Sequence, residues 1–305
     1  MDFYKMNYDI LQQIKIDSAR KQGLTGKGIC VAVLDTGIGP HEDFGWKKGR
    51  VKAFYDCVNR KSQAYDDNSH GSHVAGIIGS EGISPAGYRI GVAPECHFVI
   101  VKVLDNRGNG KVPCVIEGLR WVRENQKKYQ IRIVNISVGT PATGKEDEES
   151  ELVREVEKTW DSGIVVIVAA GNNGPNRQSI TVPGISRKVI TVGASDDEKF
   201  ARKGNGKSYY SGRGPTITCI KKPDLVAPGA NVCSCGPFRD GYIVKSGTSM
   251  STPLVSGAVA LLLEKSPYLT NLQVKKRLWQ STDDLGMSWE KQGYGQLNLE
   301  KLLRI

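Results

Sequence analysis

The sequence lacks any long apolar run, and this excludes a membrane-spanning helix. A helix that crosses a bilayer needs roughly 20 consecutive, mostly apolar residues, whereas the longest apolar stretch here is only residues 255–263. The first residues, MDFYKMNYDILQQIKID, contain no apolar core after a basic start and do not resemble a secretory signal peptide. We therefore expect no membrane partner and a cytoplasmic location.

The sequence also lacks the paired cysteine spacing of a disulfide-rich domain or a zinc finger. Its seven cysteines are an odd number, they are scattered, and several stand inside apolar runs. The spacing Cys233-x-Cys235 would suit a structural zinc ion only with a second such pair, which the chain does not contain. We expect buried thiols outside disulfides, as in a reducing compartment.

A concentrated charge of one sign is missing as well. The chain has 42 lysines and arginines against 32 acidic residues, which gives a net charge of +10. Basic pairs such as Lys47-Lys48 and Arg187-Lys188 are far apart, and an acidic run occupies residues 146–149. A nucleic-acid-binding protein needs a clustered basic stripe and a recognisable binding module. We find neither and expect no nucleic-acid partner.

Short apolar segments alternate with longer helical patterns along the whole chain. This alternation, with β-branched residues in the short segments, predicts an α/β fold with a parallel sheet covered on both faces. Ligands of such a sheet bind beyond the carboxyl ends of its strands. The predicted strands are residues 29–34, 98–104, 131–138, 163–170 and 188–193, and the predicted helices are 70–78, 113–128, 151–161, 253–265 and 270–280.

Four polar residues stand at these strand ends or helix starts. Asp35 directly follows the strand 29–34, and Asn172 closes the strand that ends at residue 170. His70 opens an apolar helix, where an imidazole can act as a base near neutral pH. Ser249 lies at or just before the start of a buried helix, so its N–H is available to an anion. Each of these residues, taken singly, also has another explanation. Asp35 and Asn172 would be turn residues, Ser249 would be a helix cap, and His70 would form a metal-binding pair with His73.

Taken together, these residues resemble one known family. Asp35, His70 and Ser249 follow one another in the order found in subtilisin. They lie in the segments VLDTG, HGSHVAG and GTSMSTP, of which the last is highly specific. The VLDTG segment alone would also suit an aspartic protease, but no second copy is present. The sequence resembles the subtilases over about residues 26–298.

The similarity is greatest to the intracellular alkaline serine protease branch of bacterial subtilases. The residues that carry it are 129–139, 160–175 and 212–229. The resemblance implies a three-layer α/β/α sandwich with a mostly parallel sheet of about seven strands. It further implies a catalytic domain of residues 26–305, on which residues 1–25 pack as an N-terminal extension.

The resemblance implies a serine endopeptidase that acts on proteins or peptides without a catalytic cofactor. A hydroxyl is a poor nucleophile until a base removes its proton. His70 would be that base for Ser249, and Asp35 would fix the tautomer of His70 and stabilise the imidazolium. Asn172 would supply the side-chain donor of the oxyanion hole, beside the N–H of Ser249.

The substrate groove is also implied by the resemblance. An extended peptide would lie in it as an added strand, and the walls of its primary pocket carry no charge. The matching residues are Ser137, Val138 and Gly139 for one wall, Ala169, Ala170 and Gly171 for the other, Gly108 and Gly110 for the opposite edge of the groove, and Thr181 for the pocket floor.

Some features of the family match only in part. Many subtilases hold calcium with an aspartate and a loop after the histidine helix, so a structural calcium at Asp43 is one expectation. Pro85, however, stands where the asparagine of that loop would fall. Val182-Pro183 matches a peptide bond that is cis in the family.

Two other functions stay open: a catalytically idle subtilase fold that binds or regulates, and a processing peptidase dedicated to one partner protein.

Overall fold

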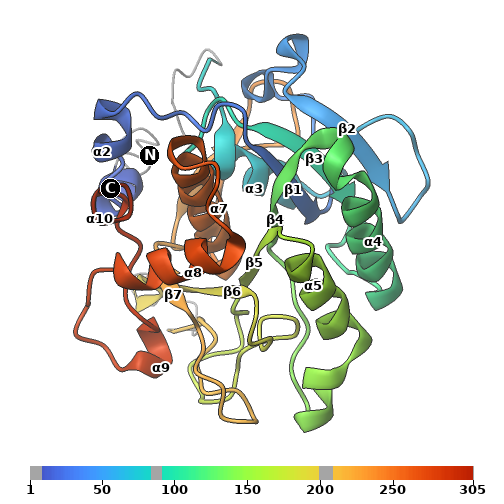
Figure 1. Ribbon diagram of the computed structural model, residues 1–305. Coiled ribbons are helices and arrows are strands. Elements are labelled where there is room, and N and C mark those ends of the chain that lie inside the picture. Colours follow the sequence, from blue (N-terminus) through green and yellow to red (C-terminus); the bar gives the residue numbers. More distant parts are fainter. Residues whose placement is uncertain (1–8, 84–90, 199–208, 305) are drawn as a thin grey trace.

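The computed structural model describes residues 9–83, 91–198 and 209–304. Its centre is a seven-stranded sheet in the order β2-β3-β1-β4-β5-β6-β7 (Figure 1). All neighbouring strands in this sheet are parallel. The strands are β1 (Cys30–Asp35), β2 (Val51–Asp56), β3 (His97–Lys102), β4 (Ile131–Ile136), β5 (Val165–Ala169), β6 (Ile190–Ala194) and β7 (Leu225–Ala227).

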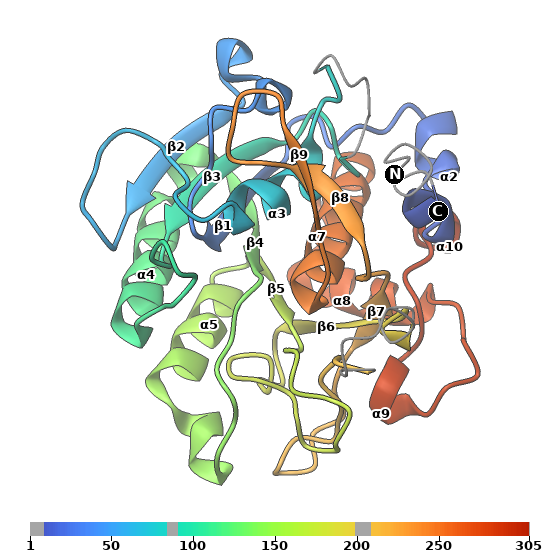
Figure 2. The same ribbon diagram turned by 180° about the vertical axis from the view of Figure 1, so that it is seen from behind.

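Helices cover both faces of the sheet (Figures 1 and 2). Helices α3 and α7 pack together on one face, and α4 and α5 pack together on the other. The predicted three-layer sandwich with about seven parallel strands is therefore confirmed. The helices are α2 (Asp17–Lys21), α3 (His70–Gly79), α4 (Val112–Tyr129), α5 (Glu151–Asp161), α7 (Thr248–Lys265), α8 (Asn271–Gln280), α9 (Trp289–Gln292) and α10 (Leu299–Leu302), with short 3-10 helices at Glu42–Phe44, Trp46–Lys48 and Lys145–Glu149.

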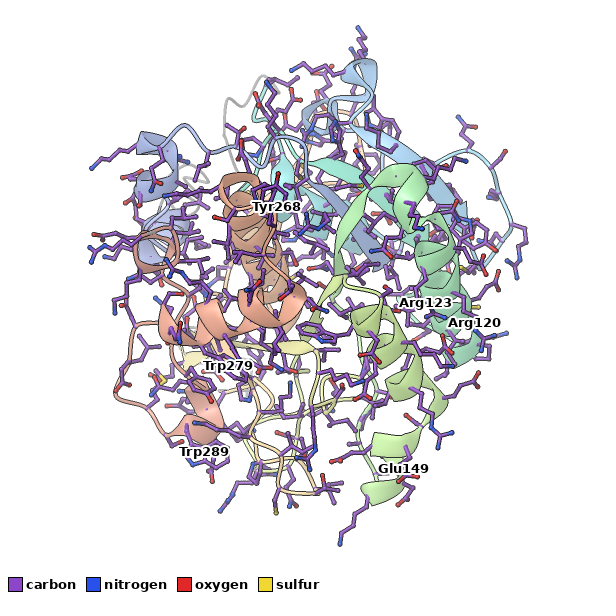
Figure 3. All side chains as sticks on the ribbon, viewed as in Figure 1. Arg120, Arg123, Glu149, Tyr268, Trp279 and Trp289 are labelled. Carbon is purple, nitrogen blue, oxygen red and sulfur yellow. The ribbon has the colours of Figure 1, made fainter. Side chains whose placement is uncertain are left out.

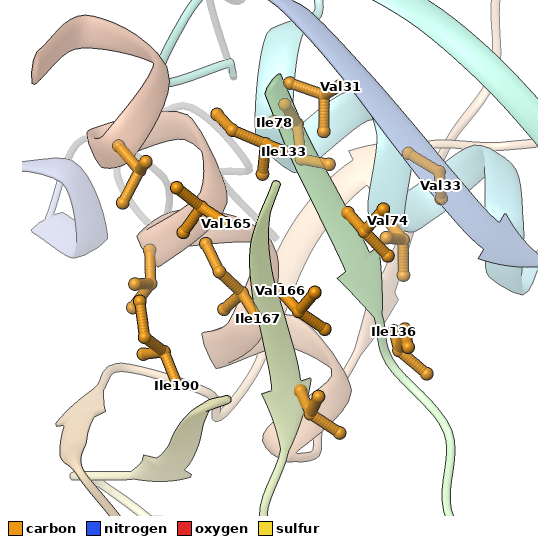
Figure 4. Close-up of a cluster of buried hydrophobic side chains, with 14 of the residues drawn as sticks. Val31, Val33, Val74, Ile78, Ile133, Ile136, Val165, Val166, Ile167 and Ile190 are labelled. Carbon is orange, nitrogen blue, oxygen red and sulfur yellow. The ribbon is translucent and has the colours of Figure 1, made fainter. Parts of the chain in front are cut away.

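The central strands are apolar on both faces because helices cover both faces. Every residue of β1 and β5 is buried. Figure 4 shows Val31 and Val33 of β1 near Val74 and Ile78 of α3. Burying a side chain of this size stabilises the fold by roughly 1.5–3 kcal/mol. This packing fixes the start of α3, and with it His70, against the carboxyl end of β1.

Ion pairs join the two helices on the other face. Arg120 and Arg123 project from α4 toward α5 (Figure 3). Arg123 lies 2.7 Å from the carboxylate of Glu155, which is almost completely buried, and Arg120 lies 3.6 Å from the same group. Basic side chains of this surface are thus paired with acidic ones. In the part of the chain that the structure describes, no helix is long and apolar enough to cross a membrane.

Helix α7 begins earlier than predicted, and this matters for Ser249. The helix starts at Thr248, so Pro253 lies inside it rather than in its first turn. Proline lacks the N–H that would bond to the carbonyl of Ser249, four residues before it. Ser249 is the second residue of the helix, and its own N–H belongs to the first turn, where no intrahelical partner exists.

Four strands were not indicated by the sequence patterns. Strand β2 lies at the edge of the sheet and is half-exposed, and β7 has only three residues. An antiparallel hairpin of β8 (Val232–Cys235) and β9 (Tyr242–Lys245) leads directly into α7.

The peptide bond Val182-Pro183 is cis, as predicted. Near the N-terminus, the carbonyl of Ile14 accepts a hydrogen bond from Leu299 of α10.

Candidate active site

The carboxyl edge of the sheet brings Asp35 and His70 together. Asp35 is the last residue of β1, and His70 is the first residue of α3. Oδ1 of Asp35 lies 2.8 Å from Nδ1 of His70 and accepts a second hydrogen bond, of 2.7 Å, from the N–H of Thr36. Asp35 is completely buried, whereas the His70 side chain is 22% exposed. The imidazole therefore connects a buried carboxylate with solvent.

This contact sets the protonation of His70. Burial disfavours the imidazolium, but the charge of Asp35 and its hydrogen bond outweigh burial and raise the pKa of His70 above 6.5. Because the carboxylate of Asp35 is an acceptor, the neutral ring carries its proton on Nδ1. The lone pair of Nε2 is then left as the basic site of the ring.

Ser249 lines the same cleft as His70. Its hydroxyl donates a 2.7 Å hydrogen bond to the main-chain carbonyl of Ser137 on the cleft wall. The hydroxyl must therefore rotate away from Ser137 before it can donate to Nε2 of His70. Catalytic hydrogen bonds of unliganded enzymes often tighten only when substrate binds, so this rotamer is compatible with a serine nucleophile.

Asn172 is held with its amide nitrogen directed away from Thr248. Its side-chain oxygen accepts hydrogen bonds from both the N–H and the hydroxyl of Thr248, each of 3.0 Å. Since the oxygen is occupied, the NH₂ group is the part of this cleft-lining side chain that can donate to a ligand. Gly247, with φ of +150°, lies close by, and a Cβ there would meet Nδ2 of Asn172 at 3.1 Å.

The cleft itself has a volume of about 420 Å³. The predicted wall residue Ala170 is buried and does not line the cleft. The predicted groove residue Gly110 lines a smaller adjoining hollow of about 80 Å³, together with apolar residues such as Val112 and Leu152. Arg107, which the sequence patterns did not indicate, also lines the cleft. The predicted groove residues that line the cleft are Gly108, Ser137, Val138, Gly139, Ala169, Gly171 and Thr181.

Thr181 lies between the two walls of the predicted pocket. A Cβ built on Gly139 would meet Oγ1 of Thr181 at 2.5 Å, and one built on Gly171 would meet its Cγ2 at 2.3 Å. Both walls therefore need glycine where they approach this side chain. Oγ1 of Thr181 is buried and has no hydrogen-bond partner among the described residues.

The sequence and the fold of this chain are similar to those of known proteins. The sequence profile of the subtilase family matches residues 26–296. Over 302 residues the chain is 42% identical to the serine protease AprX of Bacillus subtilis, covering 92% of this chain and 67% of that protein. It is 34% identical to subtilisin Savinase of Lederbergia lenta, with 96% and 97% of the two chains covered. The crystal structure of a cold adapted subtilisin-like serine proteinase superposes with a TM-score of 0.71 at 31% identity, over 90% of each chain.

The chain belongs to the subtilase family. It is therefore a serine endopeptidase with the subtilisin-like fold, and its substrates are proteins or peptides. None of these comparisons favours an idle binding protein.

Asp66 is a supporting residue of this subtilase that sequence reasoning missed. Its Oδ1 accepts a 2.8 Å hydrogen bond from the hydroxyl of Thr36, which in turn accepts one from the N–H of Gly71. Its Oδ2 accepts from both the N–H and the hydroxyl of Ser72. Burial opposes ionisation, but the hydrogen bonds from Ser72 and neighbouring N–H groups outweigh it and lower the pKa of Asp66. Asp66 thus ties the turn after Asp35 to the start of α3. The available signal was an aspartate just before a helix start.

A buried lysine supports the same turn. Nζ of Lys102, completely buried at the end of β3, donates to the carbonyls of Thr36 and Leu104 and to the carboxylate of Asp67. A lysine within the apolar run FVIVKVL was the available signal, because a buried ammonium needs partners of this kind.

The alternative metal pair of His70 and His73 is not formed. Nε2 of His73 donates a 3.0 Å hydrogen bond to the carbonyl of Val232, while His70 contacts Asp35. Burial lowers the pKa of His73 to about 3. His73 is therefore a neutral core residue that joins α3 to β8.

The cysteines follow the prediction with two exceptions. None of the seven forms a disulfide, but Cys219 is exposed and Cys114 only partly buried. Both stand outside the central strands of the sheet, where burial is greatest. The other five are buried, and Cys30 lies in the apolar run that predicted this.

The environment of Asp43 does not fit calcium. Asp43 is completely buried, and its two carboxylate oxygens accept from the N–H of Ile83 and the hydroxyl of Tyr242, at 2.9 and 2.5 Å. Calcium takes six to eight oxygen ligands, whereas the donors that gather around this carboxylate are the imidazole of His41 and the thiol of Cys235. The rest of the expected calcium loop, with Pro85, lies outside the described residues.

Proposed function

We propose that this subtilase hydrolyses peptide bonds through an acyl-enzyme on Ser249, with His70 as general base and Asp35 as its orienting partner. The observation that carries the proposal is the 2.8 Å contact between Asp35 and His70 beside the cleft that Ser249 lines. Nε2 of His70 takes the hydroxyl proton while Oγ bonds to the substrate carbonyl carbon. His70 then gives this proton to the leaving amine as the C–N bond breaks.

Water completes the reaction by the same route in reverse. His70 removes a proton from water, the resulting oxygen bonds to the acyl carbon, and Oγ of Ser249 leaves and regains the proton. In both halves the carbonyl oxygen becomes an oxyanion. We propose that Nδ2 of Asn172 and the N–H of Ser249 donate to it, because both groups are oriented before substrate arrives.

We propose that the side chain before the cleaved bond enters the cleft between the two predicted walls and reaches Thr181. The wall residues are uncharged, so a large apolar or neutral side chain is favoured over lysine or arginine. A strong preference for basic side chains would need a buried carboxylate, and none lines this cleft in the described part of the chain. The adjoining apolar hollow would accept a second apolar side chain of the same peptide.

Two further proposals concern the setting of the enzyme. We propose that catalysis needs no cofactor, since the four residues above supply base, nucleophile and donors. We also propose a cytoplasmic enzyme, which is supported by the absence of disulfides among its seven cysteines. The extension of residues 1–25 and a domain of residues 26–305 stay predictions, supported by the bond between Leu299 and Ile14.

The proposal is tested by comparing the variants Ser249→Ala and Ser246→Ala in hydrolysis of casein and of a peptide library. Ser246 is a nearby serine whose Oγ accepts from the N–H of Asn231, and it does not line the cleft. We expect Ser249→Ala to abolish turnover and Ser246→Ala to retain it. Full activity of folded Ser249→Ala would refute the proposed nucleophile, and strict cleavage after basic residues would refute the proposed specificity.

A further inference from the structure

A second cluster of donor groups lies outside the residues that line the cleft. His41, Asp43 and Cys235 are all buried, and each offers one atom that could ligate a metal ion. The three atoms lie within 4.8 Å of one another. Nδ1 of His41 is 4.0 Å from Oδ2 of Asp43, and Sγ of Cys235 is 3.9 Å from the same oxygen. Three different donor types therefore converge on one buried point.

We propose that this cluster binds one zinc-like divalent ion through Nδ1 of His41, Oδ2 of Asp43 and Sγ of Cys235. Zinc accepts this combination of nitrogen, oxygen and sulfur at bond lengths of about 2.0–2.3 Å, which in a tetrahedral site separates the donors by roughly 3.4–3.6 Å. The two separations given above exceed this by about half an ångström. The remaining pair, Nδ1 of His41 and Sγ of Cys235, is separated by up to 4.8 Å, so all three side chains must move inward to close the site, and this pair must move the most.

The ligands are already oriented for this role. Nδ1 of His41 accepts a long hydrogen bond, 3.2 Å, from the N–H of Asp43, so this nitrogen carries a lone pair rather than a proton. The carboxylate of Asp43 is held by Ile83 and Tyr242, the kind of surrounding contact that fixes metal ligands. On binding, the ion replaces the thiol proton of Cys235, which is released to solvent, and a metal–thiolate bond forms.

The site would connect two parts of the chain that carry the catalytic residues. His41 and Asp43 follow β1, which ends at Asp35, and Cys235 ends β8 in the hairpin that leads to Ser249. The two sides are 192 residues apart in sequence. Because a metal clip between them closes a long loop, it would stabilise the fold and hold the hairpin against the segment after β1.

The ion would enter at the turn of the hairpin, which lies at the surface. The turn residue Arg239 pairs with Glu42 at 2.7 Å, and the arginine side chain is 80% exposed. The carbonyl of Arg239 also accepts from the N–H of Glu42, next to both His41 and Asp43. These contacts would have to open before the ion could reach the three buried donors.

Cobalt(II) titration of full-length Ser249→Ala protein, which cannot digest itself, tests the proposal. The protein is first treated with a chelator and dialysed. We expect one equivalent of Co²⁺ to bind with a near-ultraviolet absorption band from thiolate-to-cobalt charge transfer. The band should vanish in Cys235→Ser and persist in Cys57→Ser, a control at another buried cysteine. His41→Gln should weaken binding at least tenfold.

Thermal unfolding gives a second readout that does not depend on colour. Zn²⁺ should raise the midpoint of the parent and of Cys57→Ser but not that of Cys235→Ser, and Ca²⁺ at the same concentration should not act. If Cys235→Ser does not fold, His41→Gln and Asp43→Asn carry the test. Absence of saturable Co²⁺ binding, or a charge-transfer band that survives in folded Cys235→Ser, would overturn the proposal.

Discussion

The side-chain oxygen of Asn172 accepts two hydrogen bonds from Thr248, one from its N–H and one from its hydroxyl, each of 3.0 Å. Thr248 is the residue before Ser249 and starts α7. The same helix start therefore positions the proposed nucleophile and orients the proposed oxyanion donor. The two bonds hold the amide oxygen toward the start of α7 and leave the NH₂ group to donate elsewhere.

Replacement of this donor should affect turnover rather than binding. The donation from Asn172 is fully formed only in the transition state, so Asn172→Leu should lower kcat and leave KM nearly unchanged. We expect a loss of about 100- to 1000-fold, the size known from subtilisin when such a donor is removed. Steady-state kinetics on protein counted by active-site titration gives this value.

Thr248→Val is the matched control for the orientation of Asn172. It removes the hydroxyl donor but keeps the N–H, so kcat should fall by less than in Asn172→Leu. A kcat within about twofold of the wild type in folded Asn172→Leu would leave Asn172 as a turn residue only.

The pH dependence of kcat/KM should report His70 in the free enzyme. Only the neutral imidazole can act as a base, so kcat/KM is lost as the pH falls through the pKa of His70, which lies above 6.5. Activity should persist into alkaline pH. Asp35→Asn removes the charge that raises this pKa, so it should move the inflection to lower pH and reduce kcat by about 10⁴-fold. An optimum below about pH 5 would contradict a histidine base.

Acid should destabilise the fold through His73. Its pKa is about 3 in the folded protein and near 6.5 when unfolded, so the unfolded chain binds more protons between these values. The free energy of unfolding should therefore fall as the pH falls from 6.5 toward 3, by about 1.4 kcal/mol per pH unit from this group. Urea unfolding of Ser249→Ala protein measures it, and His73→Gln should remove that part of the slope. An unchanged slope in folded His73→Gln would show that other groups cause the acid sensitivity.

Thr181 should limit the size of the side chain before the cleaved bond. Thr181→Gly removes the group that lies between Gly139 and Gly171. We expect kcat/KM for peptides with phenylalanine or tyrosine at this position to rise roughly tenfold or more relative to alanine. Competition between such peptides in one reaction gives the ratio directly. An unchanged ratio would place the floor of the pocket elsewhere.

The sequence predicted the fold and the site best in segments where a clear apolar pattern lies next to a chemically active residue. The strand before Asp35 and the helix after His70 have apolar patterns that need no tertiary information. Strand β7, with three residues, and the half-exposed β2 carry too short or too mixed a pattern to be distinguished from loops.

Contacts between distant segments could not be predicted in the same way. The bonds from Ser72 and Thr36 to Asp66 depend on how α3 docks on β1, and no periodic pattern encodes that docking. The early start of α7 was missed because Pro253 favours a first turn, while the buried packing of the helix extends it to Thr248. Cys235 and Asp43 lie 192 positions apart in the sequence but are in contact in the fold. A short sequence motif contains only residues that are close in the sequence, so it cannot predict this contact.

Labelling with a serine-directed phosphonate, followed by peptide mass spectrometry, tests the central claim most directly. The proposal predicts one adduct per molecule, on Ser249, with activity lost in proportion to labelling and no labelling of Ser249→Ala. An adduct on another residue, or activity that remains after complete labelling of Ser249, would contradict it.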